Sequence, residues 1–194
     1  MIVVFARIEY RKYGQLAFIS HLDLIRTWER IVRRARLPIA FTEGFHPKPR
    51  FSFIPPLPVG FEGEEELLDV KILEASPYVK KEIINSVVPE GIWVNSVEIV
   101  PNSDLSKTII GGIYSFNWIG RIDIRELEER LEIMGVKEWD YSSRDSDNHT
   151  VENLLSIHIP FSSQTISPKG IAQLIEGLGK IEWIKLSRTS LLKR

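Results

Sequence analysis

The feature of this sequence that most constrains its fold is one order of strand and helix patterns that occurs twice. Alternating apolar and polar residues predict strands, and apolar residues spaced by three and four predict helices. In the first half the order is strand, helix, strand, strand, helix, strand, at residues 3–9, 20–36, 50–54, 66–73, 76–88 and 92–100. In the second half the same order recurs at residues 109–119, 123–134, 136–141, 154–161, 168–178 and 181–188.

This repeated order determines the expected fold class. A β-α-β-β-α-β unit is the ferredoxin-like pattern, and a pattern repeated along a chain indicates repeated structural units. We therefore expect an α+β protein made of two tandem ferredoxin-like units packed together. Residues 101–104 are polar and rich in turn-forming types, so the predicted units span residues 1–101 and 102–194.

The first predicted helix has well-defined ends. Ser20 is a good N-cap, Asp23 follows it in the first turn, and Pro38 stops the helix. Its expected apolar face consists of Leu22, Ile25, Trp28, Val32 and Ala35. Three further helices are predicted to start at Pro77 in an N1 position and at the caps Asp123 and Ser167.

Charge is distributed unevenly along the chain. Residues 1–60 carry ten Lys and Arg against four Asp and Glu, whereas residues 61–194 carry fifteen against twenty-two. The first part is therefore +6 and the remainder −7. This asymmetry indicates an anionic partner for the first part, and it equally permits the two parts to face each other.

The first helix carries a group of basic residues. Arg26, Arg30, Arg33 and Arg34 follow one another at spacings that place them on one stripe, and Arg36 lies at its end. Such a stripe can contact successive phosphates of a nucleic acid. The alternative is a solvated face, partly neutralised by Glu29.

The segment after this helix is also basic. Strand pieces at 39–42 and 50–54 flank a loop in which His46, Lys48 and Arg50 alternate with prolines. Aromatic residues adjoin these donors at Phe45, Phe51 and Phe53. Basic side chains can hold a single-stranded backbone while rings stack on bases, so we predict RNA contact at Arg26, Arg30, Arg33, Phe45, His46, Lys48 and Arg50. The alternative is that the aromatic residues pack in the core.

Two histidines of this region are candidates for acid–base chemistry. His21 begins the basic helix and His46 lies in the loop, and Asp23 is a candidate for the carboxylate that orients an imidazole. Together they could cleave RNA without a metal ion. The competing interpretation is that a histidine at the start of a helix has a structural role.

Several other chemistries are excluded or unsupported. Without cysteine the chain can supply neither a thiolate nor a cysteine-ligated cluster, and the common motifs of zinc proteases, nucleotide-binding loops and serine hydrolases are absent. The acidic run 61–66 could bind a cation, but a solvated charge run is the commoner case. We expect no cofactor and no metal. No apolar run is long enough to span a bilayer, so we expect a cytoplasmic protein.

The same residues carry a resemblance to a known family. The sequence from Phe18 to Val70 resembles the radical SAM-linked protein family, a bacterial domain found alone or attached to cobalamin-binding radical SAM proteins. The matching motifs are Ser-His-Leu-Asp-Leu at 20–24, Arg-Arg-Ala at 33–35, Gly-Phe-His-Pro-Lys-Pro-Arg at 44–50 and Pro-Leu-Pro-Val-Gly at 56–60. Gly63 departs from the family pattern, which often has serine there.

This resemblance implies a class of partner and no reaction. The leading hypothesis is a non-catalytic RNA-binding accessory module for tRNA or ribosomal RNA, working with a radical SAM modification enzyme. DNA and membranes are not expected partners. Two alternatives stay open: a metal-independent endoribonuclease with a histidine base, and a protein-interaction adaptor.

Overall fold

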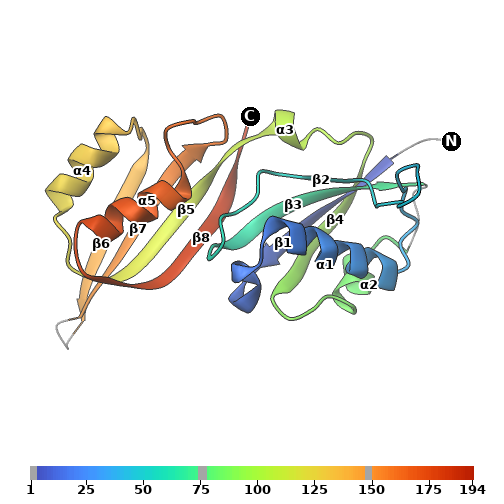
Figure 1. Ribbon diagram of the computed structural model, residues 1–194, viewed down its shortest axis with the longest axis horizontal. Coiled ribbons are helices and arrows are strands. Elements are labelled where there is room, and N and C mark those ends of the chain that lie inside the picture. Colours follow the sequence, from blue (N-terminus) through green and yellow to red (C-terminus); the bar gives the residue numbers. More distant parts are fainter. Residues whose placement is uncertain (1–3, 74–77, 147–149) are drawn as a thin grey trace. The chain divides into compact units, whose positions relative to one another are not determined.

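The chain divides into two compact units, Met1–Ile109 and Ile110–Arg194. The computed structural model describes residues 4–73, 78–146 and 150–194. Each unit contains strands with helices beside them (Figure 1). In the described part of the chain, no helix is long and apolar enough to cross a membrane.

The first unit is built in the ferredoxin-like order. Its elements are β1 (Val4–Lys12), η1 (Gly14–Phe18), α1 (His21–Arg34), β2 (Phe51–Phe53), β3 (Glu62–Ile72), α2 (Lys81–Asn85), β4 (Ile92–Val100) and α3 (Leu105–Thr108). Within this unit the strand order is β4-β1-β3-β2, and each neighbouring pair is antiparallel. Each of the two crossover helices therefore connects two parallel strands, and one antiparallel strand lies between those two strands in the sheet.

The second unit repeats this arrangement. Its elements are β5 (Ile109–Gly120), α4 (Ile124–Ile133), β6 (Trp139–Ser146), β7 (Thr150–Pro160), α5 (Pro168–Gly177) and β8 (Ile181–Lys193). The strand order is β8-β5-β7-β6, and β7 is antiparallel to both β5 and β6. The predicted fold class, an α+β protein with tandem βαββαβ units, is confirmed.

Helix α1 starts where its sequence predicts. The hydroxyl of Ser20 accepts a hydrogen bond from the backbone N–H of Asp23, which satisfies one of the free donors of the first turn. The buried face differs from the predicted one at Leu22, which is 54% exposed. The residues that are buried on α1 are Leu24, Trp28, Ile31 and Val32. Their spacing of four, three and one residues defines a stripe that excludes Leu22.

The core of the first unit lies between α1 and the sheet. Trp28 is fully buried and its ring meets the ring of Tyr10 on β1 edge-on, with the centroids 4.8 Å apart. Residues Ala6, Ile8 and Tyr10 alternate along β1 and point into the same cluster. This packing fixes the position of α1 on the sheet and leaves its opposite side free.

Several predicted bounds change in the structure. Helix α2 begins at Lys81 instead of residue 76, and the expected N1 residue Pro77 lies outside the described residues. Strand β6 begins at Trp139, three residues later than predicted, because the turn after α4 continues through Gly135, which has a φ of 78°. Strand β3 begins earlier, at Glu62, since pairing with β1 extends as far as Gly63. Patterns of single segments do not reveal such pairing.

The division between the units lies after residue 109, beyond the polar segment 101–104. Asp104 belongs to the first unit because its carboxylate accepts a hydrogen bond of 2.6 Å from Arg7 on β1. The short helix α3 follows, with Leu105 buried. The polar segment is therefore tied to the first sheet by an ion pair and by one apolar side chain.

Candidate nucleic-acid interface

The basic side of α1 lies opposite its buried side. Arg26, Arg30 and Arg33 are all exposed and occupy positions i, i+4 and i+7 of the helix. Arg26 also donates to the carboxylate of Asp23 at 3.1 Å, and both side chains remain more than half exposed. An exposed pair of this kind contributes little to stability. We call the three arginines the arginine stripe.

The end of α1 adds another arginine in an unusual conformation. Arg36 has a φ of 52°, the only positive value at a non-glycine position among the described residues. Its N–H bonds to the carbonyl of Arg33, and the N–H of Leu37 bonds to the carbonyl of Val32. These two bonds form the Schellman motif that closes a helix, a position where glycine is preferred. The exposed Arg36 therefore extends the basic surface at a conformational cost.

The basic loop is closed at its base by backbone pairing. The N–H of Thr42 bonds to the carbonyl of Lys48, and the Thr42 hydroxyl accepts from the N–H of Lys48. Phe41 and Pro49 form an isolated bridge beside them. The loop between these residues is therefore held at both ends, which limits the entropy it loses when a ligand binds. We call residues 42–48 the closed loop.

The tip of the closed loop carries a solvent-exposed ring. Phe45 is 102% exposed, and His46, Lys48 and Arg50 are exposed as well. The other two aromatic residues of the predicted set behave differently: Phe51 and Phe53 are half-buried on β2 and pack against the core cluster. The predicted aromatic set therefore contains one ring that is exposed to solvent and two rings that are partly buried in the fold.

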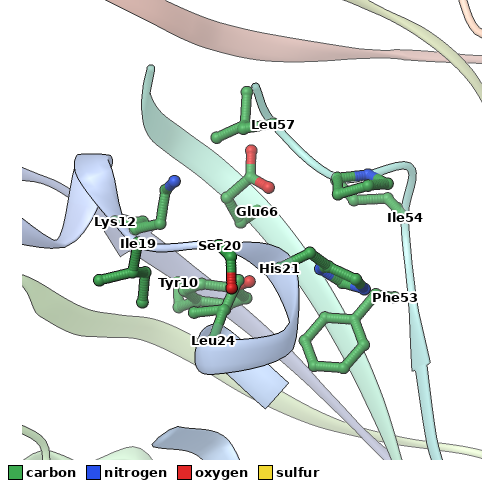
Figure 2. Close-up of a pocket in the computed structure, with 11 residues that line it drawn as sticks. Tyr10, Lys12, Ile19, Ser20, His21, Leu24, Phe53, Ile54, Leu57 and Glu66 are labelled. Carbon is green, nitrogen blue, oxygen red and sulfur yellow. The ribbon is translucent and has the colours of Figure 1, made fainter. Parts of the chain in front are cut away.

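A pocket lies at the opposite end of α1, where the helix begins. Figure 2 shows its lining side chains, which come from β1, β3, the start of α1 and the segment after β2. The pocket is lined by Tyr10, Lys12, Ile19, Ser20, His21, Leu24, Phe53, Ile54, Pro56, Leu57 and Glu66. We call it the His21 pocket.

The imidazole of His21 lines this pocket. Its ring meets Phe53 edge-on, with the centroids 5.3 Å apart and an interplanar angle of 83°. Among the described residues, its buried Nδ1 has no hydrogen-bond partner. Burial lowers the pKa of His21 below its ordinary value, and the nearby charge of Lys12 lowers the pKa further. The imidazole is therefore neutral at pH 7.

The structure does not bring the two candidate histidines together. His21 contacts Phe53 on β2, whereas the closed loop begins at the bridge between Phe41 and Pro49. Pro49 and Phe53 are separated by about 13 Å of extended chain. Figure 1 shows the segment between α1 and β2 at the end of the unit where α1 finishes. His46 therefore belongs to the loop site and His21 to the pocket.

Asp23 does not act as the carboxylate that orients an imidazole, because its carboxylate bonds to other side chains. Its carboxylate accepts from the Ser20 hydroxyl at 2.7 Å and from Arg26 at 3.1 Å. These bonds hold the pKa of Asp23 below its ordinary value, the Ser20 hydroxyl being the larger cause. Asp23 thus connects Ser20, at the lip of the pocket, with Arg26, at the near end of the arginine stripe.

Sequence reasoning did not assign the two charged residues Lys12 and Glu66 to this pocket, and it considered Glu66 only as part of the acidic run 61–66. Lys12 is 3% exposed and Glu66 is 4% exposed. Glu66 is folded back over Gly63, where an added Cβ would approach the carboxylate to 2.6 Å. One signal was present: residues 6, 8 and 10 of β1 are buried in alternation, and Lys12 continues that phase. A charged residue in the buried phase of a strand indicates a partner or a site.

The acidic run 61–66 contains no metal centre in its described geometry. Glu62 accepts a hydrogen bond from the backbone N–H of Gly14 at 2.9 Å, and Glu66 is buried. Within the ranges that the structure describes, no three His, Asp or Glu side chains are grouped as ligands for a metal ion.

The fold and the site together define an α+β protein of tandem ferredoxin-like units with a basic helix surface. Residues 6–159 match a family described as "uncharacterized protein conserved in bacteria (DUF2344)", and the chain belongs to this family. The match extends from β1 of the first unit to β7 of the second.

Other known proteins contribute little. No curated protein matches the chain. A crystal structure of an unknown protein from Galdieria sulphuraria is similar over 94% of this chain and 99% of its own, with 9% identity and a TM-score of 0.27. A crystal structure of a putative glycine cleavage system transcriptional repressor is similar over 95% of this chain and 99% of its own, with 8% identity and a TM-score of 0.28. Neither likeness bears on the function of this chain.

Proposed function

We propose that this protein is a non-catalytic RNA-binding accessory module that presents tRNA or ribosomal RNA to a radical SAM modification enzyme. The observation that carries the proposal is the arginine stripe: Arg26, Arg30 and Arg33 are exposed on one side of a helix whose other side is buried. Three guanidinium groups in a row suit the repeated charge of a phosphate backbone.

The closed loop adds contacts of a second kind. Phe45 exposes its whole ring at the end of the surface where α1 finishes, next to the cations Lys48 and Arg50. Rings that stack on bases and cations that hold phosphates are the two components of single-strand recognition. A loop closed by its own backbone bonds presents both without first having to fold.

The radical SAM partner is supported by sequence features alone. The motifs from Phe18 to Val70 resemble the radical SAM-linked proteins, and the chain has no cysteine with which to hold an iron–sulfur cluster. Any radical step would therefore take place on another polypeptide. The proposed role of this chain is to hold the RNA for that enzyme.

The test is a titration of fluorescent tRNA and a ribosomal RNA fragment at two ionic strengths. Binding should weaken steeply with salt, and replacement of the arginine stripe by glutamine should reduce the slope of log K against log salt by about 2, since each phosphate contact on a single strand contributes roughly 0.7. A matched control replaces Arg121, Arg125 and Arg130, which are exposed in the second unit. Equal losses in both variants would contradict the proposal.

Two other results would replace the proposal by its alternatives. Cleavage of the RNA that disappears in a His21→Ala protein would support the endoribonuclease, with His21 acting without His46. Failure to bind RNA, combined with salt-sensitive binding of the purified radical SAM protein through the arginine stripe, would support a protein-interaction adaptor.

A further inference from the structure

The His21 pocket is not used by the contacts proposed so far. Those contacts involve the arginine stripe and the closed loop, which are exposed, whereas the pocket is narrow and its charged residues Lys12 and Glu66 are almost completely buried. The pocket is nevertheless joined to the stripe, because Asp23 bonds both Ser20 at its lip and Arg26. A strand of RNA lying along the stripe would reach the pocket at the start of α1.

The chemistry of the pocket suits a small group that both donates and accepts hydrogen bonds. Lys12 can only donate, the Glu66 carboxylate accepts, and a neutral imidazole offers one nitrogen of each kind. The buried Nδ1 of His21 has no hydrogen-bond partner among the described residues. A buried polar atom without a partner is costly, so a ligand that satisfies it gains affinity. The narrowness of the pocket fits a hydroxyl better than a base.

Glu66 shows that the pocket is built with space for a carboxylate. Its Cγ, Cδ and Oε1 atoms lie where a side chain on residue 63 would begin, at 2.5 to 2.7 Å from an added Cβ. The backbone of Gly63 has no positive φ, so a side chain at residue 63 would be opposed by the position of the Glu66 side chain and not by the backbone conformation. The lining also includes apolar side chains, among them Ile19, Phe53 and Leu57. These are suitable contacts for the face of a ribose.

We propose that the His21 pocket receives a ribose 2′-hydroxyl of the bound strand and thereby distinguishes RNA from DNA. The inference rests on the proposed RNA-binding function and adds the group that is recognised. A 2′-hydroxyl is both donor and acceptor and is the one group that DNA lacks at this position. The arginine stripe alone would bind both polymers, because phosphates are common to both.

The experiment compares three labelled oligonucleotides of about 12 residues, a length within the usual range of single-strand sites. They are oligouridylate, its deoxy counterpart and its 2′-O-methyl derivative, titrated at one salt concentration. The wild-type protein should bind oligouridylate about tenfold more tightly than the other two, the effect expected for one buried hydrogen bond. His21→Leu should bind all three with the weaker affinity.

Two further variants separate recognition from folding. His21→Asn places an amide near the position of Nδ1 and should keep part of the preference for RNA. Gly63→Ala leaves His21 in place but displaces the Glu66 carboxylate, and should reduce the preference while leaving the affinity for the deoxy oligonucleotide unchanged. His158→Leu, which changes a half-exposed histidine of the second unit, is the control and should behave like wild type.

The outcomes distinguish this inference from the proposed function. Equal, salt-sensitive binding of all three oligonucleotides by the wild type would overturn the inference and leave nucleic-acid binding by the arginine stripe intact. An unchanged preference for RNA in His21→Leu would also overturn it. Absence of binding to all three would overturn the proposed function itself. If His21→Leu does not fold, imidazole NMR signals of wild-type His21 should shift with oligouridylate and not with its deoxy counterpart, and equal shifts would refute the inference.

Discussion

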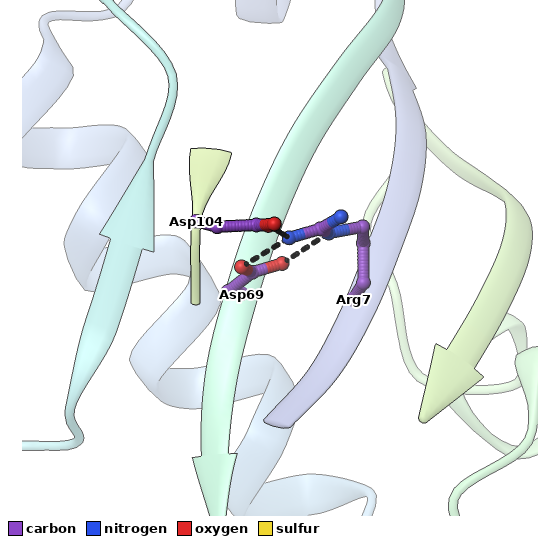
Figure 3. A network of polar contacts seen from close by, with 3 residues as sticks. All are labelled: Arg7, Asp69 and Asp104. Atoms are coloured by element: carbon purple, nitrogen blue, oxygen red, sulfur yellow. Dashed lines mark hydrogen bonds and ion pairs between the residues drawn. The ribbon is translucent and has the colours of Figure 1, made fainter. Parts of the chain in front are cut away.

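Arg7 and Asp69 lie directly opposite each other on β1 and β3 and form an ion pair through two parallel hydrogen bonds. Nε and Nη2 of Arg7 each donate to one carboxylate oxygen of Asp69 at 2.9 Å (Figure 3). The Asp69 side chain is completely buried, and Nη2 of Arg7 also reaches Asp104. The bonds to Asp69 are the largest cause that raises the pKa of Arg7, so its charge is permanent.

Removal of Arg7 should therefore destabilise the first unit strongly. Arg7→Ala leaves the buried carboxylate of Asp69 without its partner, a change that costs about 3–5 kcal/mol in comparable pairs. The free energy of unfolding, measured by urea denaturation, tests this. Asp104→Ala is the control and should cost less, because Asp104 is half exposed and water replaces its contact. Equal losses in the two variants would show that the buried pair is not the main contribution.

Arg36 should be replaceable by glycine with a gain in stability. Its φ of 52° is the left-handed conformation, which costs a residue with a side chain about 1 kcal/mol more than glycine. Arg36→Gly should raise the free energy of unfolding by roughly that amount. Arg34→Gly is the matched control: Arg34 is the last residue of α1, and glycine there should lower the stability by a similar amount. Failure of Arg36→Gly to raise the free energy of unfolding would contradict the assigned helix end.

Phe45 should contribute to RNA binding and not to folding. Its ring is fully exposed, so Phe45→Ala should leave the melting temperature unchanged. Loss of a stacking ring should weaken binding of single-stranded RNA by about 1–3 kcal/mol. Ile133→Ala, at an apolar residue that is 81% exposed on α4, should change neither property. A fall in melting temperature for Phe45→Ala would mean that the ring packs against the protein.

His21 should make the stability of the protein depend on pH. Its pKa is lowered from 6.5 in the folded state, first by burial and then by Lys12, so the unfolded chain takes up the proton at a higher pH. The contribution of the neutral imidazole is complete above pH 6.5 and is lost as the pH falls below this value. Urea denaturation between pH 7.5 and 5 should therefore show a smaller loss for His21→Asn than for the wild type. If both proteins lose the same free energy of unfolding as the pH falls, a lowered pKa of His21 in the folded state is excluded.

The local features of the fold could be predicted from the sequence because they depend on neighbouring residues. The caps Ser20, Asp123 and Ser167 all accept backbone hydrogen bonds at helix starts, as their positions predict. The order of strands and helices follows from the spacing of apolar residues, and it led directly to the tandem βαββαβ units. The arginine stripe could likewise be predicted, because it depends only on the spacing of residues along a helix.

The exposure of individual rings could not be predicted in the same way. Phe45 and Phe53 occur in similar surroundings in the sequence, yet Phe45 is fully exposed and Phe53 packs against His21. The difference arises because Phe53 lies in the strand β2, paired with β3, whereas Phe45 lies at the tip of a loop. A basic and aromatic pattern by itself therefore identified the surface but not which rings are available.

The sequence by itself determined the two units, the ends of α1 and the residues of the basic surface, since each depends on interactions within a few residues. Only the tertiary structure decided that His21, Lys12 and Glu66 meet in one pocket. They come from α1, β1 and β3, and they meet because the register of β1 on β3 pairs Tyr10 with Glu66 while α1 packs over both strands. Register is set by long-range pairing, which no local pattern in a single sequence specifies.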